Sequence, residues 1–195
     1  MTTELSDRQN QIITVSLEII SESGIQGLTI KNLAKKIGFS ESAIYRHYEN
    51  KIQILIAILN YFKENSANLF NNVQSLETDA ISKIEHLFLN LFKTFTNSPS
   101  LVAVIFSEEL FRNETVLLEK VAEVMKNNAK SLTQIIKIGQ ENNEIRKDIT
   151  AAHFSIIILG SLRMFVKNWH MTNYSVDLTE SGTEFINSIK TLIKN

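Results

Sequence analysis

The strongest constraint on the fold is the segment 29–51, whose sequence is TIKNLAKKIGFSESAIYRHYENK. Thr29 is a good N-cap, and the apolar residues after it recur at helical spacing. Gly38 favours the end of this helix, because glycine adopts the left-handed conformation at little cost. Ser40 is a second N-cap, for a short helix over 41–47. The pattern predicts two helices joined by a glycine turn, which is typical of DNA-binding helix-turn-helix units.

The charge of this segment fits contact with DNA phosphates. It holds five basic residues against two acidic ones, an excess of three positive charges, whereas the whole chain has a formal net charge of −1. A basic footprint confined to one segment is expected of a module that touches the nucleic acid backbone at one place. A structural helical hairpin without a DNA partner is the alternative that spacing alone leaves open.

The segment resembles the N-terminal DNA-binding domain of the TetR family of bacterial transcriptional regulators. The resemblance covers roughly residues 8–56, and Ala43 stands where the family often has a small polar residue. The matching residues are Thr29-Ile30, Leu33-Ala34, Ile37-Gly38-Phe39-Ser40, Ala43-Ile44-Tyr45-Arg46-His47-Tyr48, and Lys51 with Leu55. The resemblance implies a DNA-binding domain over 1–50 and a ligand-binding and dimerisation domain over 51–195. It further implies a repressor that binds a palindromic operator as a dimer and is released by a small apolar effector.

Nine residues are candidate DNA contacts. The resemblance implies backbone contacts at the positions of Thr29, Tyr45, Tyr48 and Lys51. The second helix should read base edges, for which the Ala43 methyl could meet a thymine methyl. The full set is Thr29, Ser40, Ser42, Ala43, Tyr45, Arg46, His47, Tyr48 and Lys51. Helix capping alone would explain the hydroxyls of Thr29 and Ser40, and His47 could equally be a surface residue without a role.

Composition and periodicity predict an all-α chain of about nine helices. The chain has 195 residues, 44% of them hydrophobic, and a single proline, and no run alternates with period two. Capping signals support most of the expected helix starts. The expected ranges are about 7–23, 30–37, 41–47, 51–73, 79–97, 99–111, 114–142, 148 or 150 to 171, and 177–193.

The second half of the chain is rich in phenylalanine, which usually indicates a core. The resemblance implies that some of these rings line a cavity for an apolar effector. A buried Arg163 would favour an acidic or hydrogen-bonding ligand, because an unpaired buried charge is costly. Pairing of Arg163 with an acidic residue at a dimer interface is an equal alternative. The candidate ligand contacts are Phe88, Phe92, Phe95, Phe106, Phe111, Phe154, Arg163 and Trp169.

The helix expected to end at residue 171 is apolar nearly all round, which predicts burial on more than one side. With the last helix, it is the expected homodimer surface, as the resemblance also implies. The sequence has no cysteine, no glycine-rich phosphate loop and no H-E-x-x-H motif. We therefore expect no enzyme activity, no metal and no cofactor.

We see no secretory signal and no apolar run long enough to span a membrane, and expect a cytoplasmic protein. A helical small-molecule carrier or interaction bundle, without sequence-specific DNA binding, is the alternative function.

Overall fold

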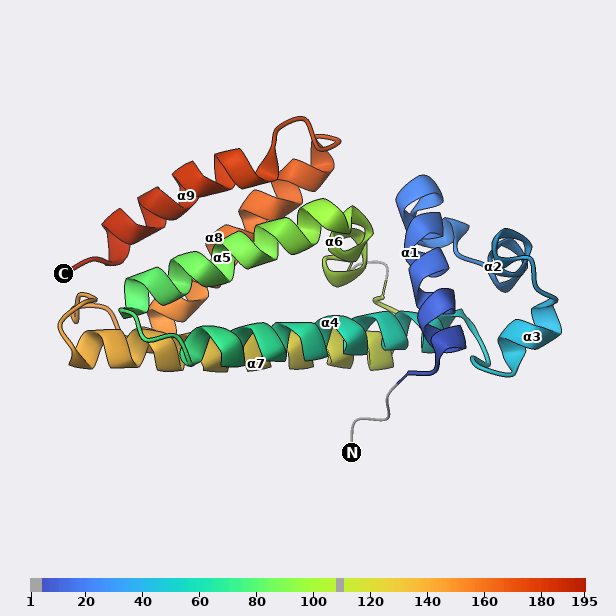
Figure 1. The fold of residues 1–195 in the computed structure, drawn as a ribbon, viewed down its shortest axis with the longest axis horizontal. Helices are drawn as coiled ribbons and strands as arrows, with labels where there is room; N and C mark the ends of the chain where they lie inside the picture. The colour runs from blue at the N-terminus through green and yellow to red at the C-terminus, as the bar shows by residue number, and fades with distance from the viewer. Residues whose placement is uncertain (1–4, 108–110) are drawn as a thin grey trace. The chain divides into compact units, whose positions relative to one another are not determined.

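The computed structural model describes residues 5–107 and 111–195 and is helical almost throughout (Figure 1). No strand occurs in these described ranges, where the one bridge joins Ile145 and Lys194. The all-α prediction is therefore confirmed. The helices are α1 (Asp7–Gly27), α2 (Ile30–Ile37), α3 (Glu41–Tyr45), α4 (Lys51–Gln74), α5 (Ala80–Asn97), α6 (Pro99–Ile105), α7 (Thr115–Glu141), α8 (Ala151–Met171) and α9 (Leu178–Ile193).

The chain forms two compact units, which divide within α4, between α5 and α6, and within α7. Unit 1 comprises the described residues of Met1–Phe62 and of Ser98–Val121, and unit 2 comprises Lys63–Asn97 and Ala122–Asn195. Unit 1 therefore holds the predicted helix-turn-helix together with α6. The predicted boundary at residue 50 separates DNA binding from ligand binding and dimerisation, whereas these two units are defined by contacts. The predicted boundary therefore remains a prediction.

The first helix begins and breaks where local sequence signals predict. The Ser6 hydroxyl accepts from the Gln9 amide, and the Gln9 side chain accepts from the Ser6 amide, which completes a capping box. At Gly24 the backbone leaves the helix with a φ of 66°, a conformation that glycine tolerates. One further turn follows the break, so α1 extends to Gly27 and not to residue 23. In unit 1, α1 packs on α6 and α2.

Helix α6 is shorter than predicted. Pro99 occupies the first turn as expected, but the Ser98 side chain makes no capping hydrogen bond. The helix ends at Ile105 instead of 111, because Phe106 leaves helical geometry, with φ −106° and ψ 23°. Just after this end, the Ser107 hydroxyl bonds to the Ala103 carbonyl. Residues 108–110 of the predicted helix lie outside the described residues.

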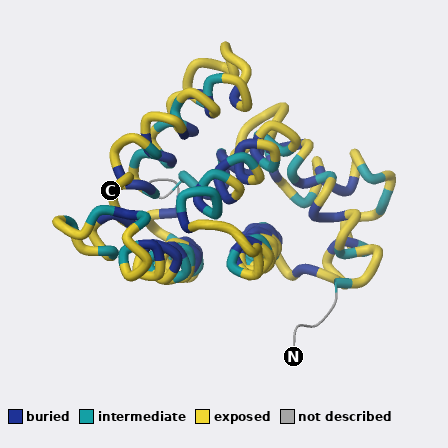
Figure 2. The backbone as a smooth tube through the Cα atoms, turned by 60° about the vertical axis from the view of Figure 1, so that its left-hand side comes forward, coloured by how far each residue is buried: buried dark blue, intermediate teal, exposed yellow. Residues whose placement is uncertain are grey.

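The core of unit 2 is built where α9 packs on α5 and α8 (Figure 1). Buried positions lie on the inner sides of the helices, and the connecting segments are mostly exposed (Figure 2). The Phe165 and Phe185 rings stack with centroids 4.6 Å apart, and Phe92 lies 5.7 Å from Phe165. Gly182 lets the Phe92 ring approach α9 closely: a Cβ at Gly182 would lie 2.4 Å from that ring.

Gly182→Ala should therefore destabilise the protein, although alanine normally favours a helix over glycine. The added methyl must displace the Phe92 ring, and we expect a loss of about 1–3 kcal/mol in the free energy of unfolding by denaturant titration. Gly182→Ala combined with Phe92→Leu tests the cause, because the smaller side chain makes room. The double variant should lose clearly less than the sum of the two single losses. Strict additivity would show that the Phe92 ring is not the obstacle.

Candidate DNA-binding surface

The predicted helix-turn-helix is present, with its capping signals in use. The Thr29 hydroxyl accepts from the Asn32 amide at 3.1 Å, and the Ser40 hydroxyl accepts from the Ala43 amide at 3.2 Å. Gly38 ends α2 in the left-handed conformation, with φ 82° and ψ 31°. Ile44 is 0% exposed and fixes α3 to the rest of unit 1. The hydroxyls of Thr29 and Ser40 thus already have backbone partners.

Helix α3 ends at Tyr45, two residues earlier than predicted. Arg46 is the C-cap, and the amides of His47 and Tyr48 both donate to the Ile44 carbonyl. This tight turn carries the chain inward, so that Tyr48 is only 6% exposed. Burial of one more aromatic ring therefore stops the helix before 47.

The outward side of α3 carries most of the predicted base-reading groups. Tyr45 is 51% exposed, and Ala43 is half-buried. The Ser42 hydroxyl lies 2.9 Å from that of Ser40. An exposed aromatic ring beside a guanidinium and an imidazole offers hydrogen-bond donors to phosphates or base edges. The exposed members of the predicted set on this surface are Ser40, Ser42, Tyr45, Arg46 and His47.

Tyr48 lies differently from what its predicted phosphate contact requires. Its hydroxyl is buried and has no hydrogen-bond partner among the described residues. Burial raises the pKa of this hydroxyl above its ordinary value of 10.0. A direct phosphate contact would require the side chain to leave the interior, so the geometry favours a packing role for the ring.

Lys51 ties the start of α4 to the end of α1. Its ammonium donates to the Ile25 carbonyl at 3.0 Å, in a part-buried position just after the break at Gly24. Burial lowers the pKa of this ammonium. The side chain of Asn50 accepts from the Gln53 amide and so caps α4. An ammonium has three donors, so Lys51 can hold Ile25 and still donate to a phosphate.

Two contacts of this surface escaped sequence reasoning. Lys36 bonds to Glu22 at 2.5 Å and lies 3.5 Å from Glu18, and the Glu22 hydrogen bond is the main cause that raises its pKa. This lysine is thus paired with α1, and like Lys31 and Lys35 it is exposed.

The Arg8 guanidinium lies 4.3 Å from the centre of the Phe39 ring and covers the turn. Both this contact and that of Lys36 join residues distant in sequence, for which the chain carries no local signal.

The predicted ligand contacts are divided between the two units. Unit 1 contains Phe106 and Phe111, and unit 2 contains the other six. The Phe88 and Phe92 rings lie in the aromatic cluster described above. Trp169 is buried and its indole donates to the Val176 carbonyl, while the Arg163 guanidinium lies 3.4 Å from the Met125 sulfur. Whether any of the eight contacts an effector remains a prediction.

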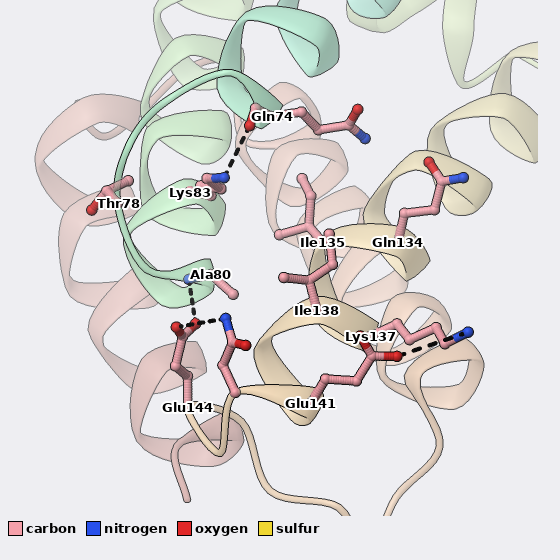
Figure 3. Close-up of a pocket in the computed structure, with 11 residues that line it drawn as sticks. Gln74, Thr78, Ala80, Lys83, Gln134, Ile135, Lys137, Ile138, Glu141 and Glu144 are labelled. Atoms are coloured by element: carbon pink, nitrogen blue, oxygen red, sulfur yellow. Dashed lines mark hydrogen bonds and ion pairs between the residues drawn. The ribbon is translucent and has the colours of Figure 1, made fainter.

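A pocket of about 370 Å³ lies in unit 2, between the start of α5 and the last turns of α7 (Figure 3). Ile135 and Ile138 face it, and polar groups surround them. Lys83 donates to the Gln74 carbonyl, and Glu144 accepts from the Ala80 amide. The lining residues in the described part of the chain include none of the eight predicted ligand contacts.

Within residues 5–107 and 111–195, no helix is long and apolar enough to cross a membrane. The same residues contain no group of His, Cys, Asp and Glu side chains that could hold a metal ion.

A helix-turn-helix whose second helix ends in an exposed aromatic residue and a basic turn, joined to a helical unit, defines a DNA-binding regulator. Residues 12–58 match the family described as "Bacterial regulatory proteins, tetR family", and residues 59–193 match "YsiA-like protein, C-terminal region". The chain belongs to the TetR family of bacterial transcriptional regulators. It is thus a ligand-responsive DNA-binding regulator and not an enzyme.

Relatives and solved structures agree over nearly the whole chain. The "Fatty acid metabolism regulator protein" of Bacillus subtilis is 25% identical, with 95% of each chain covered. "Nucleoid occlusion factor SlmA" of Vibrio cholerae is 23% identical, over 83% of this chain and 85% of the relative. The solved fatty acid degradation regulator FadR of Bacillus halodurans has a TM-score of 0.83 at 24% identity, covering 96% and 97% of the two chains. FadR of Bacillus subtilis in complex with stearoyl-CoA has a TM-score of 0.79 at 22% identity, covering 92% and 96%.

Tyr48→Phe should keep DNA affinity and raise the free energy of unfolding by about 1 kcal/mol, because it removes a buried hydroxyl that has no partner. Thermal unfolding of the two proteins measures the stability change. Tyr61→Phe is the control, since Tyr61 is exposed and its hydroxyl can reach water. A loss of operator affinity in Tyr48→Phe would instead show that the hydroxyl turns outward to a phosphate.

The raised pKa of Tyr48 gives the same comparison a pH dependence. The native state holds the proton of the Tyr48 hydroxyl more tightly than the unfolded chain does. The contribution of this group to the free energy of unfolding is therefore fully present below pH 10.0 and is lost as pH rises through the folded-state pKa. Tyr48→Phe should lose less stability in that alkaline range.

Proposed function

We propose that this protein is a repressor that binds a palindromic operator as a homodimer and is released by a small apolar effector. The observation that carries the proposal is the exposed run Tyr45, Arg46 and His47 at the end of a capped five-residue recognition helix. Two such helices related by a twofold axis would enter successive major grooves about 34–36 Å apart. Access to chromosomal DNA requires a cytoplasmic location, which is part of the proposal.

In the proposed complex, side chains at the start of α3 read bases and those at its end hold the backbone. Ser42 and Ala43 face base edges, where the alanine methyl suits a thymine. Tyr45, Arg46 and His47 donate to phosphates or to guanine. Lys51 adds a phosphate contact with the donors that Ile25 leaves available, and the amides at the start of α4 favour the same anion.

The homodimer is proposed through α8, with α9 beside it. One side of α8 is buried in unit 2, and the opposite side is exposed although it is apolar. Isolated units rarely expose such a stripe unless a partner covers it. The exposed side of α9 is mainly polar, so α8 should supply most of the apolar contact. The exposed apolar residues of α8 are Ile156, Ile157, Met164 and Met171.

The effector is proposed to be a fatty acyl compound. A curated relative is named for fatty acid metabolism, and a solved neighbour is a complex with stearoyl-CoA. The phenylalanines of unit 2 offer the apolar surroundings that an acyl chain requires. Because these rings pack on one another in this structure, a bound acyl chain would have to separate them. The predicted contacts Phe88, Phe92, Phe95, Phe106, Phe111, Phe154, Arg163 and Trp169 are retained as candidates.

The first test is selection of bound fragments from the organism's own genome, with the native protein and with Tyr45→Ala/Lys51→Ala. The native protein should recover a palindrome, and the variant should bind it at least about tenfold more weakly, because it lacks two groups that meet the DNA. Tyr61→Ala controls for loss of an exposed tyrosine outside α3. If neither protein enriches a site at low salt, the carrier without sequence-specific DNA binding becomes the better account.

The dimer surface is tested by Ile156→Asp, measured by analytical ultracentrifugation. Ile156 is 67% exposed, so the variant should fold normally yet sediment as a monomer, because a carboxylate cannot be buried in an apolar interface without a partner. Ile138→Asp is the matched control, since this isoleucine of α7 is 53% exposed and lies outside the proposed interface. A dimer that persists in Ile156→Asp would place the interface elsewhere.

A further inference from the structure

The chain passes between the two units at three places: within α4, between α5 and α6, and within α7. The division falls after Phe62 in α4 and after Val121 in α7. Of these crossings, the one in α4 leads directly into the helix-turn-helix, because α4 continues from the α3 turn through Asn50 and Lys51.

Just beyond the division, inside unit 2, polar side chains join α4 to α7. The Ser66 hydroxyl donates to the Asn128 side-chain oxygen at 2.8 Å. Three residues before Ser66, the Lys63 ammonium lies 3.1 Å from the Glu123 carboxylate. Ser66 is 3% exposed, so its hydrogen bond to Asn128 is made away from water.

This hydrogen bond can exist in only one register of α4 on α7. A shift by a single residue moves a helix by about 1.5 Å along its axis, which exceeds the distance range of a good hydrogen bond. After such a shift the Ser66 hydroxyl would exchange Asn128 for a backbone carbonyl of its own helix, and the Asn128 oxygen would lose this donor. Apolar neighbours tolerate sliding far better, because dispersion contacts are not directional. The half-exposed pair Lys63–Glu123 favours the same register but is weakened by solvent.

We propose that the Ser66–Asn128 hydrogen bond is a register lock for α4 and that the locked register is the DNA-binding state. This rests on the proposed function, in which α4 carries the response to the effector. Ser66 and Asn128 are positioning residues: they lie outside the predicted DNA contacts and the predicted ligand contacts. An effector that separates α4 from α7 would have to break this bond, so the bond sets part of the free-energy difference between the two states.

The chain offers a matched control for this lock. Ser155 of α8 is 1% exposed, and its hydroxyl donates to the Ala129 carbonyl of α7 at 3.0 Å. Ser66→Ala and Ser155→Ala thus each delete one buried serine hydroxyl that bonds to α7. Only the first of these bonds involves α4, so a purely structural effect should be alike in the two variants.

The experiment compares stability and operator affinity in full-length native protein, Ser66→Ala and Ser155→Ala. Both variants should show a similar fall in melting temperature. Ser66→Ala should also bind the operator about fivefold more weakly, the scale of one hydrogen bond, while Ser155→Ala stays within twofold of native. Equal operator affinities in the two variants, with both less stable, would overturn the lock.

A double-mutant cycle identifies the partner. If Asn128 acts through Ser66, Ser66→Ala/Asn128→Ala should lose no more operator affinity than the stronger single variant. Additive losses would assign the effect to something other than their hydrogen bond.

A spectroscopic measurement reports the register without DNA. The chain has no cysteine, so Lys35→Cys on exposed α2 gives one spin label per subunit and one distance across the dimer. Adding Ser66→Ala should broaden or shift that distance distribution, and adding Ser155→Ala should leave it unchanged. Identical distributions in both would overturn the proposal. If the native protein gives no palindrome and no inter-subunit distance, the proposed function itself fails, which is a different result from failure of the lock alone.

Discussion

A recognition helix of five residues is too short to persist in water by itself, and the DNA-binding part of this protein depends on how α3 is held. Three local interactions hold it. The Ser40 hydroxyl caps its first turn, Ile44 is buried beneath it, and the amides after Tyr45 close onto the Ile44 carbonyl. Lys51 extends this support, because its bond to Ile25 fixes the start of α4 against the end of α1. Contacts on the buried side of α3 therefore fix the position of its exposed side.

Sequence patterns predicted the structure correctly wherever it depends on residues that are close together along the chain. The caps at Ser6, Thr29 and Ser40 act over three residues, and the structure uses all three as predicted. The failures also have a physical pattern. Helix α3 stops early because Tyr48 turns into a core built by other helices, and α6 stops early where Phe106 leaves helical geometry. Whether a residue enters a core is decided by partners that local periodicity does not reveal.

The same distinction separates the parts of the candidate site. Tyr45 ends a short helix and Arg46 and His47 follow it in a turn, and their exposure depends on this local pattern, so the sequence could predict it. Retraction of the Tyr48 hydroxyl, the tie of Lys51 to Ile25 and the contact of Arg8 with Phe39 involve residues up to 31 positions apart. The effector region is the extreme case, because its phenylalanines are equally suited to a core and to a cavity.

The close approach of Phe92 to Gly182 has a consequence for the way such a chain can diverge. The ring occupies the space where a side chain of α9 would begin, so the two positions share one volume. A mutation that enlarges residue 182 is tolerated only after residue 92 has become smaller, whereas a smaller residue 92 leaves a void that a larger residue 182 could fill. In related chains the two positions should therefore change as a pair and in that order, even where the rest of unit 2 varies freely.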